Sequence, residues 1–449
     1  MLESVPRTAR RSTWGIAAIW VGFGFVVTGL VVGGQLAGQG GTAGMPMGQA
    51  FLTVAAGELF LFILTILLGI PAMATGFNLA MLARFSYGRV GMVVPMVVMA
   101  LLTLGWFSSI LGMIGDVWGV LLGSPTGVTV IDPAVLGRPG IAPISLEVVL
   151  SCLVFGALFT WTAYRGISAI EKIALPVAPF VLIVSLVVGI AMVKDFGGWD
   201  AVVAESNTRS GFGFGSGLTL VIGAWIAGAI MGPDIMRFAK NRKAVLIGAA
   251  ACFIITNPLL NVVGYIGTIA TGDANFVNWM YVQGVFIALI GVLVWTVSLW
   301  TTNNSELYSN SLYTGAGMNS VGWNVRRTSI VLVVGIIGTI LGSLGFYQLF
   351  FADFITVLGA AFVPLAGPII ADYYLLRKSV YTDANLTRQR PVRWTGVVSF
   401  LLGAVCGIVF QYFLPLPGGF SAGVAALIVT LVVHVGLHYL LPGVRAEDR

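Results

Sequence analysis

The sequence predicts an all-α integral membrane protein with twelve transmembrane helices. Its mean hydropathy is +0.97, 58% of the residues are hydrophobic and only 9% are charged, against roughly 25% charged residues in soluble domains. Because a span needs about 20 apolar residues, 449 residues hold about a dozen spans and no separate soluble domain. Two of the apolar segments are interrupted by glycines at mid-depth, which predicts discontinuous helices.

Short polar stretches separate the apolar segments and set the boundaries of the predicted spans. The first segment is full length and has no clear cleavage site, which favours a retained span over a signal peptide. Residues 82–89 are expected to form a short basic loop on the inner side. The predicted spans cover residues 13–36, 48–72, 92–121, 145–164, 170–193, 216–238, 243–270, 280–303, 327–346, 350–375, 394–413 and 420–441.

The distribution of Lys and Arg predicts the topology. With a cytoplasmic N-terminus and twelve spans, all of the 23 Lys and Arg residues except Arg138, Lys194 and Arg209 fall on the cytoplasmic side. We therefore expect a multi-pass protein of the plasma (inner) membrane with both termini in the cytoplasm. The net charge of +6 is explained by this bias and indicates no nucleic-acid partner. The three cysteines lie singly in apolar segments and predict neither a disulfide nor a metal site.

Two spans are predicted to be broken, the first and the sixth. Residues 223–234 combine three glycines, a proline and the carboxylate of Asp234, and residues 20–29 are also rich in glycine. Interrupted segments five spans apart indicate an inverted-repeat transporter with its site at the breaks. The alternative is that these glycines only let helices pack closely. The predicted division is a ten-helix core in 1–378, with repeats at about 13–193 and 216–375, and a cytoplasmic connection with two appended helices in 379–449.

Two tryptophans lie deep in the predicted spans. Trp106 in the third span and Trp225 at the sixth-span break are away from the interfacial positions that Trp usually occupies. Their indole rings could hold a flat heterocycle between them, and stacking on one aromatic face contributes about 1–3 kcal/mol per base. The alternative for each residue is ordinary helix packing.

A group of hydroxyls in the eighth span predicts a cation site. Ser298, Thr301 and Thr302 share one helix face. Together with carbonyls freed at the first-span break, from Gly22 and Phe25, they would form an oxygen-rich site for a small monovalent cation. The alternative is that the hydroxyls bond back to carbonyls of their own helix.

Several ionisable residues lie within the predicted spans and are functional candidates by default. Three of the acids are expected near helix ends in contact with solvent, whereas Glu58 is deeper and could carry a proton or pair with a polar group. The two histidines of the last span are expected at the cytoplasmic interface. The residues are Glu58, Asp116, Asp234, Asp353, Asp372, His434 and His438.

Five segments of the chain carry recognisable motifs, at residues 82–88, 105–107, 223–241, 300–308 and 369–373. In these motifs the chain resembles a known transporter family, the nucleobase–cation symporters, in its cytosine permease branch. The resemblance extends in order from about residue 5 to residue 373. It implies the twelve-span leucine-transporter fold, with a 5+5 inverted repeat and discontinuous helices 1 and 6, and transport of nucleobases or related heterocycles with Na⁺ or H⁺.

The resemblance also implies roles for individual residues. Trp106 and Trp225 match the aromatic pair that stacks the substrate, and Asn303 lies in the matched eighth-span motif and is placed with the substrate-binding residues. The pocket beside the base would be lined by Val26, Ala224 and Ala227. The sodium ligands would be Gly22, Phe25, Ser298 through its backbone oxygen, Thr301 and Thr302.

Three positions depart from the family pattern. A pocket Gln is Thr103 here, a pocket Asn is Ser298, and two sixth-span serines are Ala224 and Ala227. A hydroxyl cannot read a pyrimidine edge through two hydrogen bonds as an amide can, so a larger or less polar heterocycle is favoured over cytosine.

The expected function is secondary active import of a nucleobase-like or hydantoin-like heterocycle coupled to Na⁺, by a monomer in the lipid bilayer. The alternative is a proton-coupled permease, for example for a thiamine-precursor pyrimidine. No catalytic motif is found in the sequence, and an enzyme is not expected.

Overall fold

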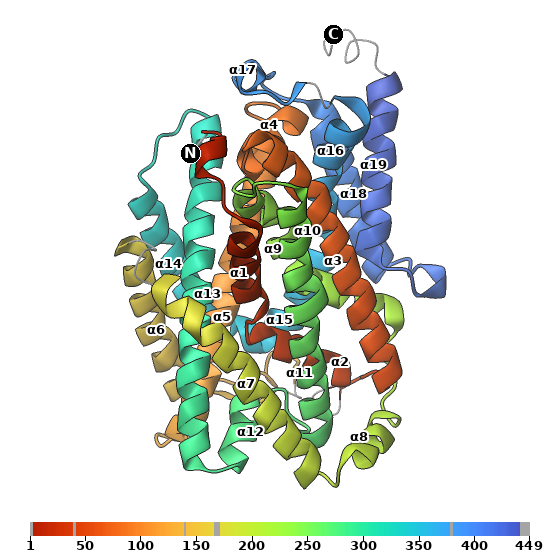
Figure 1. Cartoon of the computed structure of the whole chain (residues 1–449). Helices are drawn as coiled ribbons and strands as arrows, with labels where there is room; N and C mark the ends of the chain where they lie inside the picture. The colour runs from red at the N-terminus through yellow and green to blue at the C-terminus, as the bar shows by residue number, and fades with distance from the viewer. Residues whose placement is uncertain (1–2, 39–41, 139–140, 166–170, 378–379, 441–449) are drawn as a thin grey trace.

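The computed structural model describes residues 3–38, 42–138, 141–165, 171–377 and 380–440, and most of them are helical (Figure 1). The apolar segments are α1 (Thr13–Gly24) with α2 (Thr28–Ala37), α3 (Met47–Thr75), α5 (Val93–Leu122), α6 (Leu146–Arg165), α7 (Glu171–Asp195), α9 (Phe214–Met236), α10 (Arg242–Ala250) with η4 (Ala251–Thr256) and α11 (Asn257–Thr271), α13 (Val285–Ser320), α14 (Arg327–Ser343), α15 (Phe346–Val357) with η5 (Leu358–Phe362), η6 (Val363–Leu365), α16 (Ala366–Ala371) and η7 (Asp372–Leu376), α18 (Trp394–Tyr412) and α19 (Ala422–Leu440).

These segments correspond to the twelve predicted spans. Within the described residues, nine helices are long and apolar enough to cross a membrane. The pair α1–α2 and the end of α7 with its neighbour α8 (Trp199–Ser206) meet the same test as bent pairs, and α14 is a shorter apolar helix. The all-α, twelve-helix class is therefore confirmed.

The connecting segments differ in length, and the longest lies between α5 and α6. They contain η1 (Arg7–Ala9), α4 (Leu79–Tyr87), α12 (Phe276–Val282), α17 (Asp383–Leu386), η9 (Pro417–Gly419) and an antiparallel pair of strands, β1 (Thr129–Ile131) and β2 (Ile144–Ser145). The predicted basic loop at 82–89 is mostly the helix α4. Asn78 caps this helix by accepting a hydrogen bond from Met81 N at 2.9 Å, and Gly88 ends it with a φ of +91°.

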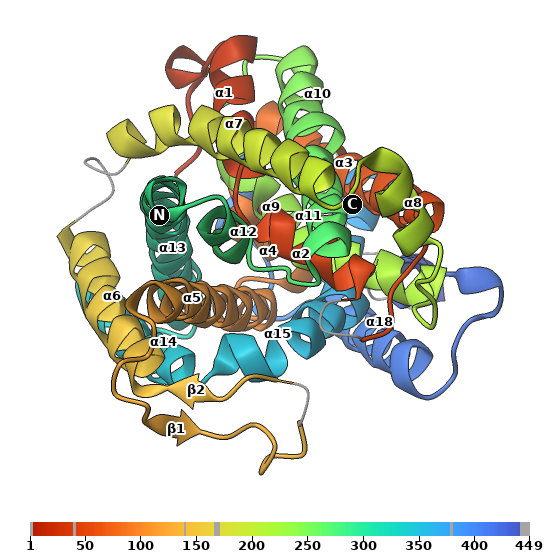
Figure 2. The same ribbon diagram turned by 90° about the horizontal axis from the view of Figure 1, so that it is seen from below.

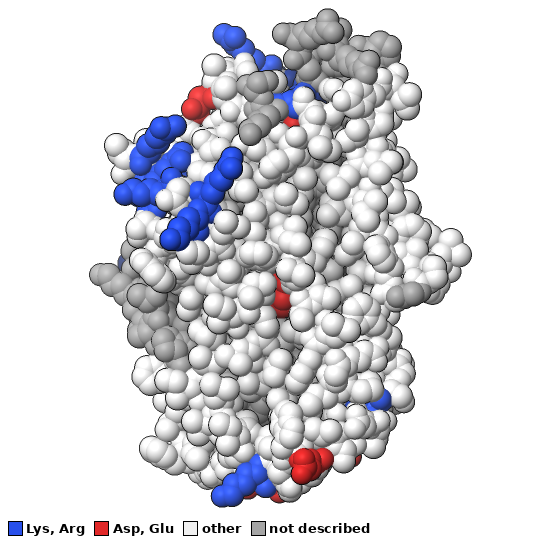
Figure 3. All heavy atoms as spheres, turned by 45° about the vertical axis from the view of Figure 1, so that its right-hand side comes forward, with Lys and Arg blue, Asp and Glu red and all other residues white. Residues whose placement is uncertain are grey.

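The helices form one elongated bundle. Seen from below, α5 lies between α13 and α15, and α2 lies beside α11 (Figure 2). The first segment of the chain and the end of α19 lie at the same end of the bundle (Figure 1), as an even number of spans requires. On the face in Figure 3, Lys and Arg gather towards that end, and a broad middle band carries almost no charge. This distribution matches the bias that predicted the topology.

The predicted break in the first span is confirmed. Helix α1 ends at Gly24, α2 begins at Thr28, and their axes differ by 50°. Phe25 N donates to Val21 O at 3.0 Å, and the next backbone donor to bond within the break is Gly29 N, to Val26 O. The carbonyls in between therefore lose their usual helical partners.

The sixth span differs from the prediction, because α9 is one uninterrupted helix that includes residues 223–234. The reason is packing. Gly223 faces the junction of α15 and the π-helical η5. A Cβ at Gly223 would lie 1.7 Å from Ile355 O in α15, and one at Gly359 in η5 would lie 1.9 Å from Thr219 O. These glycines serve a close backbone crossing, which was the alternative for this stretch. Pro233 lies in the last turn of α9, where it interrupts little of the helix.

This crossing leads to a stability prediction. Gly223→Val should destabilise the protein by about 1–3 kcal/mol or more, because the new side chain meets backbone atoms that cannot rotate away. The melting temperature of the purified protein measures the effect. Gly48→Ala is the matched control, since a Cβ at Gly48 meets no atom within 4 Å, and it should not lower the melting temperature. A Gly223→Val protein as stable as the wild type would contradict the packing account.

The eighth span is longer than predicted. Helix α13 continues to Ser320, so the polar motif at 300–308 lies within the helix and not at its end. Polar side chains of this motif can hydrogen-bond to carbonyls of their own helix. The hydroxyl of Ser305, for example, donates to Thr301 O at 3.1 Å.

A buried ionic cluster joins the tenth span to the last two. Asp372 pairs with Arg377 at 2.5 Å and with His434 Nε2 at 3.0 Å, and His434 Nδ1 bonds Ser399 Oγ at 3.1 Å. Asp372, Arg377 and His434 are all buried. The expectation that Asp372 meets solvent and that His434 faces the cytoplasmic interface was therefore wrong. The division at residue 378 stays a prediction.

Candidate functional site

The break in the first span presents free backbone oxygens. Within the described chain, no backbone hydrogen bond reaches the carbonyls of Gly22 or Phe25, because the ladder resumes only from Val26 onwards. Gly22 and Phe25 are partly exposed, and a Cβ at Gly22 would meet no atom within 4 Å. The break is therefore open on the side of Gly22, whereas a Cβ at Gly24 would lie 1.6 Å from Thr256 Oγ1 of the seventh span.

Three oxygens cluster on α13. The hydroxyls of Thr301 and Thr302 both donate to Ser298 O at 2.9 Å. This is the back-bonding that was the alternative for these residues. It also gathers the three oxygens that the resemblance assigns to the ion, on two side chains that remain partly exposed. In the described chain, no hydrogen bond links these oxygens to Gly22 or Phe25. Their convergence on one ion stays a prediction.

The two deep tryptophans lie on different helices, and each is held by other aromatic rings. Trp106 on α5 makes edge contacts with Phe351 and Phe354, at centroid distances of 5.8 and 6.0 Å. Trp225 on α9 meets Phe253 edge-on at 6.0 Å. Trp106 and Trp225 are 5% and 8% exposed, and the buried Trp106 Nε1 has no hydrogen-bond partner among the described residues. An unpaired indole N–H is a donor available to a bound ligand.

The expected pocket residues differ in what they can offer a ligand. Val26, Ala224 and Ala227 are apolar and buried. The hydroxyl of Thr103 donates to Met99 O at 2.8 Å and accepts from Asn310 Nδ2 at 2.9 Å, so it is already engaged. Asn310 was not singled out from the sequence, although an amide inside a long helix was the available signal.

Asn303 is anchored to the third span. Its Nδ2 donates to Phe107 O at 3.3 Å, and its buried Oδ1 has no partner in the described part of the chain. The carbonyl of Phe107 follows Trp106, so Asn303 ties α13 to the tryptophan segment. Its assignment to the substrate stays a prediction.

Asp234 has a structural role that the sequence did not indicate. Its Oδ1 accepts a hydrogen bond from Leu79 N at 3.0 Å, at the start of α4, and its Oδ2 accepts from Tyr313 OH at 2.6 Å. The carboxylate therefore joins α9 to α4 and α13, and it lies at the favourable N-terminal end of a helix. This arrangement leaves Asp234 a poor candidate for a free proton carrier.

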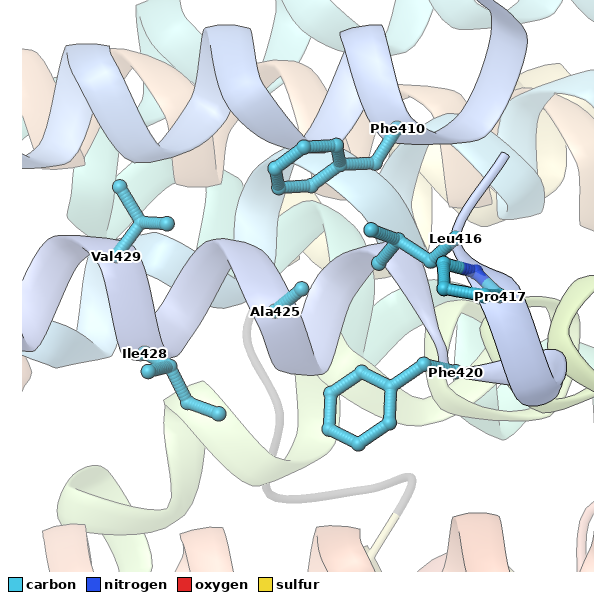
Figure 4. A pocket seen from close by; sticks show the side chains of 7 residues that line it. All are labelled: Phe410, Leu416, Pro417, Phe420, Ala425, Ile428 and Val429. Carbon is cyan, nitrogen blue, oxygen red and sulfur yellow. The ribbon is translucent and has the colours of Figure 1, made fainter. Parts of the chain in front are cut away.

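The other acids lie at polar contacts nearer the helix ends. Asp116 accepts from Gln348 Nε2 at 2.6 Å, and the exposed Asp353 pairs with Arg138 at 2.5 Å. A pocket elsewhere is lined only by apolar side chains of α18, α19 and the turn between them (Figure 4). It holds no polar side chain that could orient a heterocycle, and it is remote in sequence from the first-span break.

Residues 4–433 match the family of permeases for cytosine/purines, uracil, thiamine and allantoin. The cytosine permease of Escherichia coli (strain K12) is 29% identical over 430 residues, which cover 96% of this chain and 94% of that protein. The hydantoin permease of Microbacterium maritypicum is 25% identical, over 96% of this chain and 86% of that protein.

The solved structures of Mhp1, a nucleobase-cation-symport-1 family transporter, share the fold. The closed conformation with bromovinylhydantoin bound has a TM-score of 0.75 and 21% identity, over 99% of this chain and 97% of that one. The inward-facing conformation has a TM-score of 0.78 and 20% identity, over 100% and 96%. The leucine-transporter-like fold class is thereby confirmed. The chain belongs to the cytosine/purine permease family and is a membrane transporter, not an enzyme.

Proposed function

We propose that this protein imports a flat heterocycle together with Na⁺. The observation that carries the proposal is the broken first span, where the Gly22 and Phe25 carbonyls accept no backbone hydrogen bond from any described residue. Hard, uncharged oxygens of this kind suit a small monovalent cation. The oxygens of Ser298, Thr301 and Thr302 complete the proposed ligand set from α13.

The substrate would lie between Trp106 and Trp225. Two relatives are named as a cytosine permease and a hydantoin permease. Both names indicate a substrate with a planar, nitrogen-containing ring. The walls at Ala224 and Ala227 are apolar, and the hydroxyl of Thr103 is engaged with Asn310. These features favour a heterocycle that is larger or less polar than cytosine, because the site offers few groups to read a pyrimidine edge.

Coupling would follow from the position of the ion. An ion held jointly by the break and by α13 stabilises the arrangement of spans one and eight that forms the pocket, so each ligand tightens the other. Rocking of one helical group against the rest would then expose the site to either side. We place the protein in the plasma (inner) membrane, with both termini cytoplasmic and a monomer as the functional unit.

A binding screen tests this proposal. Purified protein is heated with single nucleobases, hydantoins or thiamine-precursor pyrimidines, each with Na⁺ or with choline. A specific ligand raises the melting temperature by mass action, and we expect at least one heterocycle to do so more strongly in Na⁺. If no heterocycle shifts the melting temperature in either salt, the proposed substrate class is wrong.

The ion site gives a separate prediction. Thr302→Ala removes one proposed ligand and should raise the Na⁺ concentration for half-maximal uptake by about tenfold, the effect of roughly 1.4 kcal/mol. Thr314→Ala is the control, because its hydroxyl lies further along α13 and donates to Asn310 Oδ1 at 3.0 Å. An unchanged Na⁺ response in Thr302→Ala would remove this hydroxyl from the ion site.

A second candidate is proton-coupled transport of the same class of substrate. The observation that favours it is Glu58, a buried carboxyl that forms no ion pair in the described chain. Uptake driven by a Na⁺ gradient at fixed pH, compared with uptake driven by a pH gradient without Na⁺, separates the two candidates.

A further inference from the structure

Two basic segments that are far apart in the sequence meet at one end of the bundle. The first precedes α1, and the second runs from the end of α9 into the start of α10. Their backbones pair, because Arg11 N donates to Phe238 O at 2.7 Å and Lys240 N donates to Arg11 O at 3.2 Å. The pairing brings together the cations of both segments. These are Arg7, Arg10, Arg11, Arg237, Lys240, Arg242 and Lys243.

The segment before α1 is fixed to the bundle at both of its ends. Val5 is buried, and its N–H donates to Gly76 O at 3.0 Å. Arg10 Nη1 donates to Met73 O at 2.6 Å, near the end of α3. The charges of this segment therefore have defined positions beside those of the second segment.

Most of these cations have no counter-ion in the protein. Arg10 and Arg237 donate to backbone carbonyls, whereas the other five side chains form no hydrogen bond or ion pair with the described residues. Residues 4–15 and 235–250 contain no Asp or Glu, and Glu3 forms no ion pair with any described residue. A surface of one charge sign attracts ligands of the opposite sign.

The cations border an apolar surface that faces outwards. On α10, Leu246 follows Arg242 and Lys243 by four and three residues, so it shares their helix face, and it is 44% exposed. Ile255, further along the same span, is 60% exposed. Trp14, in the first turn of α1, is 78% exposed, and Trp is enriched where a membrane meets water. In Figure 3, the grouped Lys and Arg side chains border the uncharged middle band.

We propose that a basic patch at the ends of α1 and α10 binds the headgroup of an anionic phospholipid. The patch consists of Arg7, Arg11, Lys240, Arg242 and Lys243. The lipid would lie in the leaflet on the side of the chain termini, which is cytoplasmic in the proposed orientation. Clusters of about four to eight Lys and Arg next to a span favour anionic lipids.

The surroundings of the patch favour a lipid over a soluble anion. The cations of the two paired segments hold the phosphate, and the acyl chains lie along exposed apolar side chains such as Leu246. A soluble anion would meet the same charges without this apolar contact. A zwitterionic lipid carries a cation of its own, so it gains less from the patch. The proposal goes beyond the proposed transport function and depends on neither its substrate nor its ion.

Native mass spectrometry of the purified full-length chain tests the proposal by counting bound lipids. The protein is titrated with phosphatidylglycerol or with phosphatidylcholine of the same acyl chains, and the wild type should bind phosphatidylglycerol more tightly. Arg242→Gln combined with Lys243→Gln should weaken phosphatidylglycerol binding by about 25-fold, about fivefold for each charge removed, and leave phosphatidylcholine binding unchanged. Arg242→Lys combined with Lys243→Arg keeps both charges and should bind as the wild type does.

A matched control removes the same charge elsewhere. Lys194→Gln combined with Arg209→Gln changes residues that flank α8, at the opposite end of the bundle (Figure 1), and should leave phosphatidylglycerol binding at the wild-type level. Equal losses in the two neutralised double variants would show an effect of net charge and overturn the proposal. Equal affinity of the wild type for the two lipids would also overturn it. If inorganic phosphate at the concentration of the lipid displaces phosphatidylglycerol, the patch binds a soluble anion and the lipid assignment is wrong.

Discussion

Asp372→Ala is expected to destabilise the protein by about 3–5 kcal/mol, the largest loss of stability that we predict for a single substitution. The substitution leaves the Arg377 guanidinium buried without its counter-ion, and it removes the acceptor of His434 Nε2. Arg377 Nη2 would keep its hydrogen bond to the Phe85 carbonyl, at 2.6 Å. Because Ser399 and His434 lie on α18 and α19, the cluster also fixes these helices to the tenth span, which carries Asp372.

Thermal unfolding of the purified protein measures this loss. Asp353→Asn is the matched control, because Asp353 pairs with Arg138 at the same distance of 2.5 Å but is 56% exposed. An exposed ion pair contributes about 0–1 kcal/mol, so this variant should unfold close to the wild type. Equal losses in the two variants would show that burial does not determine the contribution of the Asp372 pair.

Trp225→Ala is expected to reduce substrate affinity by about 10- to 100-fold, since one stacking face contributes about 1–3 kcal/mol per base. Uptake at low substrate concentration should fall by the same factor. Trp225→Phe retains an aromatic face and should recover part of the activity. Uptake unimpaired in Trp225→Ala would mean that this indole packs against Phe253 and does not contact the substrate.

Two controls separate binding from folding in this experiment. Trp161→Ala changes an indole that is 55% exposed on α6, so uptake should remain close to the wild-type level. The melting temperature of Trp225→Ala shows how much stability is lost with the edge contact to Phe253 at 6.0 Å. If uptake by Trp225→Ala falls by more than the amount of folded protein does, the additional loss reflects weaker substrate binding.

The spans and the first break could be predicted because both depend on local sequence. Hydropathy over about 20 residues determines which segments cross a membrane. The break at residues 25–27 follows from a run of glycines with no helix-favouring neighbours, and the structure confirms it. The resemblance to the family rested on short motifs in the same way, and the match over residues 4–433 confirms it.

The differences arise where a partner far along the chain decides the outcome. The glycine at 223 indicates either a break or a close crossing, and only the presence of Ile355 and Gly359 opposite it distinguishes the two. Asp372 and His434 are far apart in sequence and were each placed at a surface, because nothing local shows that they meet.

The sequence indicates which residues could form the candidate site, but it does not indicate which of them contact one another. Among the described residues no backbone hydrogen bond reaches the Gly22 or Phe25 carbonyl, and the hydroxyls of Thr301 and Thr302 both bond to Ser298 O. The role of these oxygens as ion ligands stays a prediction. The engagement of Thr103 with Asn310 was missed. Distances between helices depend on the whole bundle, so a linear sequence cannot supply them.

Uptake into proteoliposomes under an imposed Na⁺ gradient, with equal pH on both sides, tests the central claim most directly. The heterocycle that raises the melting temperature is supplied outside in radiolabelled form. We predict accumulation above the external concentration, lost when the gradient is collapsed and weakened in Thr302→Ala. Equilibration to the external concentration with no response to Na⁺, or binding without any uptake, would contradict the account.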